Sequence, residues 1–336
     1  MKILTISDIQ AIITTLGFED FLRRLVKTLE TDFHRWPDFQ KSARQATHSA
    51  HGVIELMPCS DQEYYTFKYV NGHPENTDHG KLNVVAIGQL SSVATGYPLM
   101  ISDMTLLTAL RTAATGGLAA KYLARDNSQS LAIIGNGAQS EFQTIVLAHL
   151  FPIREVRYYD TDYKAMEKFA TNLADSAFAL KPCLNVAEAI YGADMIVTAT
   201  AAKKKQCLFT LDQLAPGTYI QGIGGDCPGK TELSRELMMN AKVVVEHTLQ
   251  SIVEGDIQQC SAADIYAELW QLVCEIKAGR ENNTEITVFD SVGFALEDFS
   301  ILTMIYGLAN ELQLGTDFEL LPELDNPKDL YGLLRS

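Results

Sequence analysis

Short apolar runs alternate with amphipathic segments through the second half of the chain. Apolar runs predict buried strands, and segments with one apolar face predict helices. The predicted strands lie near residues 131–135, 156–160, 195–199, 219–223, 243–246 and 286–289, and the predicted helices near 138–150, 163–177 and 186–191. Strands that alternate with helices are typical of a parallel sheet with right-handed crossovers, so the predicted fold class is α/β.

The first part of the chain shows a different order of elements. Helical periodicity runs from Ser7 to Arg35, with a break expected at Gly17, and residues 102–123 form a further helical stretch rich in small residues. Strands are predicted at residues 51–57, 64–70, 83–90 and 97–100, whereas residues 39–49 form a polar segment. The polar break at residues 125–128 is the preferred domain boundary, and a last helix is expected at residues 296–312.

Alternation within residues 64–70 assigns side chains to two faces of the predicted strand. Tyr65, Phe67 and Tyr69 fall on one face, and Thr66 and Lys68 fall on the other.

A glycine turn follows the apolar run 131–134. Gly135 would allow a tight turn and Gly137 would let the backbone approach a ligand, with a helix following from Ala138. Strand, glycine turn and helix form the arrangement that binds a dinucleotide pyrophosphate at a helix N-terminus. Ser140 stands where the usual fingerprint has a third glycine, so this motif alone leaves a plain strand–helix turn equally open.

Asp160 ends the next predicted strand, 25 residues beyond Gly135. A carboxylate at that place would accept hydrogen bonds from the adenosine ribose and would repel a 2′-phosphate, which favours NAD over NADP. The alternative is a turn residue, or the N-cap of the helix expected near Tyr163.

Composition limits the classes of partner. The 336 residues include 42 acidic and 27 basic side chains, a formal net charge of −15, so neither nucleic acid nor an anionic membrane surface is an expected partner. No apolar run is long enough to span a membrane, and no signal peptide follows Met1. The six cysteines have no framework spacing, which predicts reduced thiols in a cytoplasmic protein.

Polar clusters follow several of the predicted parallel strands, where ligands bind in such sheets. These clusters contain Thr198 and Thr200, Asp290 and Ser291, and the run Gly224-Gly-Asp-Cys-Pro-Gly-Lys-Thr-Glu-Leu233. The run places one acid and one lysine in an unusual backbone path, and the alternative is a structural loop with solvated charges. His48 and His51 lack further ligands nearby, so no metal is expected. Residues 203–205, all lysine, are expected to form a solvated loop.

Seven runs of the sequence together resemble the ornithine cyclodeaminase/μ-crystallin family. They are Lys41-Ser-Ala-Arg44, Gly52-Val-Ile-Glu-Leu-Met-Pro58, Phe67-Lys-Tyr-Val-Asn-Gly-His-Pro74, Ala109-Leu-Arg-Thr-Ala-Ala-Thr115, Gly135-Asn-Gly-Ala-Gln-Ser-Glu-Phe-Gln143, the run 224–233 and Val288-Phe-Asp-Ser-Val-Gly-Phe-Ala-Leu-Glu-Asp298. The resemblance implies a Rossmann-type NAD domain at residues 126–312. It also implies a substrate-binding and dimerisation domain at residues 1–125, joined by the C-terminal tail 313–336 folded back onto it, and a homodimer.

The resemblance also implies an activity. Members of this type convert L-ornithine to L-proline and ammonia, with bound NAD⁺ as a transient hydride acceptor and no net redox change. By motif match, Asp226 would accept and donate protons. Arg44 and Lys68 would bind the substrate carboxylate, Val292 would supply an apolar wall, and Glu55 would help to orient the site.

The NAD-binding residues implied by the same comparison come from several runs. Besides Gly135 and Gly137, they are Asn83, Arg111, Ala138, Gln139, Asp160, Thr200, Ile220, Gln221, Gly222, Ile223, Lys230 and Ser291. Asn83 stands where the family more usually has threonine, and its amide can still form hydrogen bonds.

Other activities within the family stay open at this point. They are alanine dehydrogenase, ketimine reductase and lysine cyclodeaminase, and a non-catalytic binding protein of the μ-crystallin type is a further alternative. Asp226 within its complete run argues against a pure binder, because binding alone needs no proton shuttle.

Overall fold

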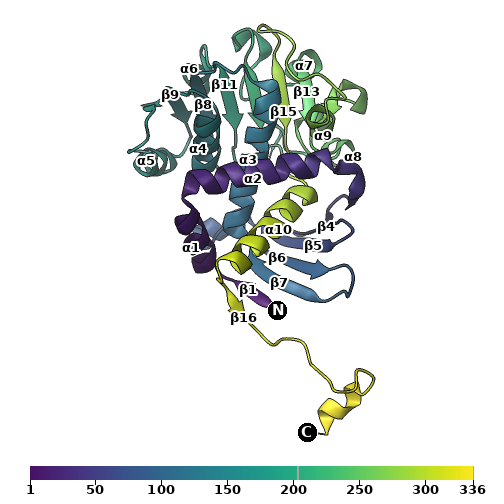
Figure 1. The fold of residues 1–336 in the computed structure, drawn as a ribbon. Helices are drawn as coiled ribbons and strands as arrows, with labels where there is room; N and C mark the ends of the chain where they lie inside the picture. Colours follow the sequence, from purple (N-terminus) through teal and green to yellow (C-terminus); the bar gives the residue numbers. More distant parts are fainter. Residues whose placement is uncertain (203, 336) are drawn as a thin grey trace.

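A computed structural model describes residues 1–202 and 204–335. The expected solvated loop at 203–205 lies partly outside the described residues, because Lys203 is not among them. Two eight-stranded sheets make up the molecule, with helices α2 and α3 between them (Figure 1). No helix in the described chain is long and apolar enough to cross a membrane.

The first sheet is mixed and has the order β16-β1-β7-β6-β5-β4-β2, with β3 also paired to β4. Its strands are β1 (Lys2–Leu4), β2 (Gln40–Lys41), β3 (Gln45–His48), β4 (Val53–Ser60), β5 (Tyr64–Gly72), β6 (Ala86–Ser92), β7 (Pro98–Asp103) and β16 (Thr316–Asp317). The four predicted strands are confirmed as β4, β5, β6 and β7. No strand was predicted within the polar segment 39–49. Strands β2 and β3 form there by pairing with β4, and they have no apolar pattern of their own.

Helices cover only one face of this sheet. Helix α10 (Ala295–Glu311) packs against β4, β5 and β6, while α3 (Thr105–Leu123) contacts β6 and α1 (Ile6–Leu16) contacts β1. Helix α2 (Phe18–His34) packs on α10 and α3. Thr66 and Lys68 of β5 are buried, whereas Tyr65 is exposed, as the alternation predicts. Helix α10 therefore lies with the first sheet. The family resemblance had placed it in the NAD domain, at residues 126–312.

The second sheet is parallel throughout, with the order β10-β9-β8-β11-β12-β15-β13-β14. Its strands are β8 (Ser130–Ile134), β9 (Glu155–Tyr159), β10 (Ala179–Pro182), β11 (Met195–Thr198), β12 (Tyr219–Gly222), β13 (Lys242–Val245), β14 (Ala267–Glu268) and β15 (Thr287–Asp290). The six predicted strands and the α/β class are confirmed. β8 has β9 on one side and β11 on the other, so the strand order reverses there, which is where such sheets bind ligands.

Short helices connect these strands. They are α4 (Ser140–Leu150), α5 (Tyr163–Asn172), α6 (Val186–Ile190), α7 (Arg235–Asn240), α8 (Thr248–Ser251) and α9 (Leu269–Val273). The 3₁₀ turns are η1 (Trp36–Asp38), η2 (Pro74–His79), η3 (Leu211–Gln213), η4 (Asp256–Gln259), η5 (Ala262–Asp264) and η6 (Leu330–Leu334). Helix α5 ends five residues before its predicted end at 177.

Small residues let α3 approach the second sheet closely. A side chain at Gly116 would overlap that of Gln221 on β12, and one at Gly117 would overlap Val146 of α4. The small-residue pattern of this helix is therefore explained by helix–sheet and helix–helix packing.

The C-terminal chain joins the first sheet only briefly. Strand β16 pairs with β1, with Asp317 opposite Lys2. Residues 318–335 then leave the body of the molecule (Figure 1) instead of folding back over it.

The glycine turn has the geometry that its sequence predicts. Gly135 has a φ of 95°, and its N–H donates to the carbonyl oxygen of Tyr159 at 2.9 Å. A Cβ at Gly135 would lie 2.6 Å from the carbonyl oxygen of Ala199, whereas one at Gly137 would meet nothing within 4 Å.

Replacement of these two glycines by alanine is expected to have unequal effects. Gly135→Ala combines a left-handed backbone with a steric overlap, so it should lower the free energy of unfolding by about 2 kcal/mol or more. Gly137→Ala should change it by less than about 0.5 kcal/mol. Urea unfolding of both variants measures this, and equal stabilities would contradict the turn geometry.

Asp194 holds the start of the second sheet where the chain enters it. Its carboxylate accepts hydrogen bonds from Gln129 N at 2.8 Å, from Ser130 N at 3.0 Å and from Arg125 Nη2 at 2.5 Å. Burial opposes ionisation of this carboxyl, but the hydrogen bonds from Gln129 and Ser130 outweigh it and keep the pKa of Asp194 below its usual value.

Asp194→Ala is expected to lower the free energy of unfolding by about 3 kcal/mol at about pH 7. Because the folded pKa is lowered, the contribution is present above the ordinary carboxyl pKa and is lost as pH falls through the folded value. Denaturant titrations at neutral and strongly acidic pH should show the difference from the parent shrinking in acid. The control is Asp126→Ala, which removes an exposed carboxylate from the segment that Asp194 binds. A pH-independent loss would contradict this account.

Candidate functional site

The carboxyl ends of β8, β9, β11, β12 and β15 carry most of the residues singled out in the sequence. The glycine turn follows β8, Asp160 follows β9, Thr200 follows β11, and residues 223–233 follow β12. Ser291 and Val292 follow β15, and Arg44, Lys68 and Arg111 reach the same region from the first sheet and from α3.

A buried ionic cluster forms where β5, α3 and α10 meet. Lys68 Nζ lies 2.9 Å from Asp298 Oδ1, and Arg111 Nε lies 3.0 Å from the same oxygen. Arg111 also donates to Glu297. Burial, followed by the charge of Arg111, lowers the pKa of Lys68 to about 8, and burial raises the pKa of Glu297 to about 7. Arg111, which the family comparison assigns to NAD, thus has two carboxylate partners within the chain.

Arg44 connects the first sheet to the segment after β15. Its guanidinium donates to Glu55 Oε2 at 3.1 Å and to the carbonyl oxygens of Val292 at 2.6 Å and Gly293 at 2.7 Å. Glu254 Oε2 lies 3.4 Å from Nε of the same arginine. Arg44, Glu55 and Val292, which were assigned separately to the substrate, therefore lie together.

Glu254 belongs to this group but was not predicted from the sequence. Burial raises its pKa to about 7, although the charge of Arg44 opposes the shift. The charges of Glu55 and Asp226 raise it further, which places Glu254 within electrostatic reach of the predicted proton shuttle. No sequence motif marks this residue.

Asp226 is accessible, whereas its lysine partner is buried. The Asp226 side chain is 56% exposed and that of Lys230 is 8% exposed, and Lys230 Nζ lies 3.0 Å from Asp226 Oδ1. The alternative of a loop with two solvated charges therefore fails for Lys230. Lys230 engages one carboxylate oxygen, and the other can meet a ligand.

Two buried acids fix the loop that carries Asp226. Asp256 Oδ1 accepts the N–H groups of Glu232 at 2.6 Å and Leu233 at 2.8 Å. Asp290 in turn accepts the N–H groups of Asp256 and Ile257, at 2.9 and 2.8 Å. Burial raises the pKa values of both acids, that of Asp256 to about 7.

Asp160 contacts the glycine turn directly. Its Oδ2 accepts the N–H of Asn136 at 2.6 Å, and its Oδ1 accepts the N–H of Asp162 at 2.8 Å. The N-cap of α5 is Asp162, which accepts from Lys164 N, so the N-cap alternative for Asp160 was wrong. Asp160 is a turn residue in this structure, and it also lies where the ribose of a dinucleotide is expected.

The remaining residues assigned to the cofactor differ in what they expose. Ile220 and Gln221 have fully buried side chains in the second sheet, with Gln221 Nε2 donating to Gln143 Oε1 at 2.6 Å. Thr200 N donates to Glu232 Oε1 at 2.8 Å, and Ser291 donates to the buried Glu246. Ile220 and Gln221 are paired with strands on both sides, whereas Gly222 ends β12 and Ile223 follows it at the carboxyl edge of the sheet.

Several buried polar atoms around the glycine turn lack a partner within residues 1–202 and 204–335. They are Asn136 Oδ1 and Nδ2 and Gln139 Oε1. In the first domain, the buried Asn83 Oδ1 also lacks a partner among the described residues. An unpaired buried polar group costs about 1–3 kcal/mol, so these atoms fit a ligand with phosphate and hydroxyl groups. Gln139 follows Ala138 at the start of α4, where an anion is also favoured. A dinucleotide therefore fits this cradle.

No group of three or more His, Cys, Asp or Glu that could hold a metal ion occurs among the described residues.

Four acids of the site were not predicted from the sequence: Glu246, Glu254, Glu297 and Asp298. Glu297 and Asp298 lie within a run that carries the family resemblance, but their partners lie far away in the chain.

Four similarities to known proteins bear on this arrangement. The family described as ornithine cyclodeaminase/mu-crystallin matches residues 9–313. The ornithine cyclodeaminase of Agrobacterium tumefaciens (strain Ach5) is 47% identical over 331 residues, which cover 98% of this chain and 93% of that protein.

Two solved structures share the fold over nearly the whole chain. A lysine cyclodeaminase, described for its recognition of L-lysine, L-ornithine and L-2,4-diaminobutyric acid, superposes with a TM-score of 0.93 at 28% identity, covering 99% of each chain. An archaeal alanine dehydrogenase dimer with bound NAD has a TM-score of 0.88 at 32% identity, covering 96% of this chain and 99% of that one. The family match and the near full-length identity show that this chain belongs to the ornithine cyclodeaminase/μ-crystallin family.

Proposed function

We propose that this protein is an NAD-dependent ornithine cyclodeaminase that converts L-ornithine to L-proline and ammonia. The observation that carries the proposal is the position of Asp226, an accessible acid held by the buried Lys230 at the end of a parallel strand. The 47% identity to the Agrobacterium enzyme along nearly the whole chain supports this particular member of the family.

The cradle after β8 supports NAD as the cofactor. Gly135 allows the tight turn, Asn136 and Gln139 offer unpaired polar atoms, and Asp160 would accept the ribose hydroxyls. The further residues proposed to hold NAD are Asn83, Arg111, Gly137, Ala138, Thr200, Ile220, Gln221, Gly222, Ile223, Lys230 and Ser291. When bound, NAD⁺ would supply a hydride acceptor for the substrate α-carbon and, once reduced, the hydride that converts the cyclic imine to proline.

The chain's own residues bind and orient the amino acid. Arg44 and Lys68 would hold the substrate carboxylate. Arg44 would then bind it in addition to Glu55 and Glu254, and Lys68 in addition to Asp298. Val292 would line the substrate with apolar surface. Ring closure is intramolecular, because the δ-amine and the α-carbon belong to one molecule. Fixing the carboxylate would help to hold these two groups in the correct geometry.

Asp226 would carry the protons of the reaction. Its free oxygen would take a proton from the substrate amine and give one to the departing ammonia. Lys230 holds the other oxygen and so fixes the orientation of the carboxylate. Glu254, within electrostatic reach of Asp226, would help to receive the positive charge of a diamino acid.

The sheet face away from α10 supports a homodimer. Ile54, Leu56, Tyr65 and Ile87 of β4, β5 and β6 are 38–52% exposed on neighbouring strands. Contiguous apolar surface of this kind is rare on monomers and common at subunit interfaces. We also propose a cytoplasmic location, since the cysteine spacing shows no disulfide framework.

Asp226→Asn is expected to bind NAD like the parent and to lose at least about a hundredfold in kcat, because the amide cannot accept the proton. The assay is proline formation from L-ornithine with trace NAD⁺. Ornithine deuterated at the α-carbon should give proline that retains the label. Net accumulation of NADH with ornithine or alanine would point instead to a dehydrogenase, and unchanged proline formation in the variant would remove Asp226 from the mechanism.

Asp160→Ala is expected to raise the Kd for NAD about tenfold and to narrow the preference over NADP, because two ribose hydrogen bonds and one repelling charge disappear. Fluorescence titration with both dinucleotides measures this. Asp162→Ala, which removes a nearby carboxylate at the N-cap of α5, is the matched control. Equal effects of the two variants would show that Asp160 acts only on local structure.

A further inference from the structure

Beyond β16, the C-terminal arm (residues 318–335) has apolar side chains that its own chain leaves exposed. Phe318, Leu320, Leu330, Tyr331 and Leu334 are 49, 56, 63, 64 and 79% exposed, respectively. Figure 1 shows the arm extending away from both sheets and ending in the η6 turn. Apolar residues gathered on a projecting segment indicate a surface that they cover.

The tip of this arm has a defined shape. Residues Leu330–Leu334 form a 3₁₀ turn, and Asp329 Oδ1 accepts the N–H of Gly332 at 3.0 Å. A preformed turn loses less conformational entropy on docking than an unstructured tail. The tip thus presents Leu330, Tyr331 and Leu334 as one apolar unit.

The arm is also acidic. It carries Glu319, Glu323, Asp325 and Asp329 against Lys328 and Arg335. In a chain of net charge −15, most of the surface would repel it. Its docking site should therefore combine an apolar floor with basic side chains.

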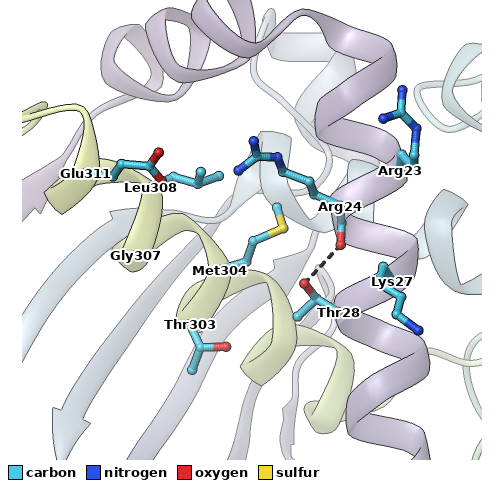
Figure 2. A pocket seen from close by; sticks show the side chains of 9 residues that line it. All are labelled: Arg23, Arg24, Lys27, Thr28, Thr303, Met304, Gly307, Leu308 and Glu311. Carbon is cyan, nitrogen blue, oxygen red and sulfur yellow. Dashed lines mark hydrogen bonds between the residues drawn. The ribbon is translucent and has the colours of Figure 1, made fainter.

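A cleft of about 500 Å³ between α2 and α10 has this combination. Met304, Gly307 and Leu308 of α10 supply its apolar part, and Arg23, Arg24 and Lys27 of α2 line the other side. Figure 2 shows Arg24 directed across the cleft toward Leu308 and Glu311, the acid of the lining. Arg23 and Arg24 share the carboxylate of Asp20, so their charge is only partly neutralised. Lys27 lies 3.6 Å from Glu30, which also pairs with Lys121.

The direction of the arm indicates which copy of the cleft it reaches. It leaves from the β1–β16 edge of the first sheet and runs away from α2 and α10 of its own chain (Figure 1). The apolar face that a second copy would cover belongs to the same sheet. A fully extended arm of this length spans at most roughly 60 Å, enough to pass around a partner domain.

We propose that the C-terminal arm of each subunit crosses to the other subunit and docks its η6 tip in the partner's α2–α10 cleft. The inference rests on the proposed homodimer. The arm makes the interface larger than the sheet faces alone, and the acidic arm residues face the arginine and lysine side chains of α2.

The test places a photoreactive p-benzoylphenylalanine at Tyr331 in the full chain. Unlabelled and ¹⁵N-labelled subunits are mixed, irradiated and digested, and crosslinked peptides are read by mass spectrometry. Crosslinks from the arm to α2 or α10 peptides that pair light with heavy subunits are expected. The proposal is overturned if all crosslinks stay within one isotope, if they reach another surface, or if none form.

Charge reversal in the cleft gives an independent reading. Arg24→Glu with Lys27→Glu is expected to lower the mixed-isotope crosslink yield at least about fivefold, while Lys181→Glu on exposed β10 should not. Light scattering on the same samples separates the two proposals. A dimer without mixed crosslinks rejects the arm contact alone, and a monomer rejects both.

Discussion

Two buried cations pair with two acids at the first turn of α10. Lys68 pairs with Asp298, and Arg111 pairs with both Glu297 and Asp298. The side chains come from β5, α3 and α10, so the cluster fixes a helix late in the chain against the first sheet. Their charges attract strongly in the interior, but each also loses hydration. Removing one member would leave an uncompensated buried charge at a cost of about 3–5 kcal/mol. The cluster therefore fixes how α3 and α10 pack against the first sheet.

Three further buried acids hold loops where no basic side chain is needed. Glu246 accepts the N–H groups of Val292 and Gly293, and Asp256 and Asp290 accept pairs of N–H groups in the neighbouring segments. Burial raises the pKa of each of these acids. Carboxyl oxygens that bind successive backbone N–H groups make the loops rigid. The residues proposed to meet substrate are thus held before it arrives.

Much of the second domain could be predicted from local pattern. Most of its six principal strands are buried and largely apolar, whereas β9 (Glu-Val-Arg-Tyr-Tyr) alternates buried and half-buried residues. Strands β10 and β14 were not predicted, because β10 is exposed and β14 has two residues, so neither shows a period. The alternation of β5 correctly assigned Lys68 to the face opposite Tyr65, since successive side chains of a strand point to opposite sides. Glu254 could not be predicted, because only folding brings it beside Arg44.

The sequence by itself determined the α/β class, the glycine turn and the family, and it singled out Asp226 as a candidate site residue. Each of these depends on local pattern or on contiguous motifs. Only the tertiary structure decided that α10 packs on the first sheet, that Arg111 pairs with Glu297 and Asp298, and that the C-terminal arm projects from the molecule. These outcomes depend on which buried charges and apolar surfaces meet across long separations in the chain. Desolvation and close packing govern that choice, and neither has a local signature in the sequence.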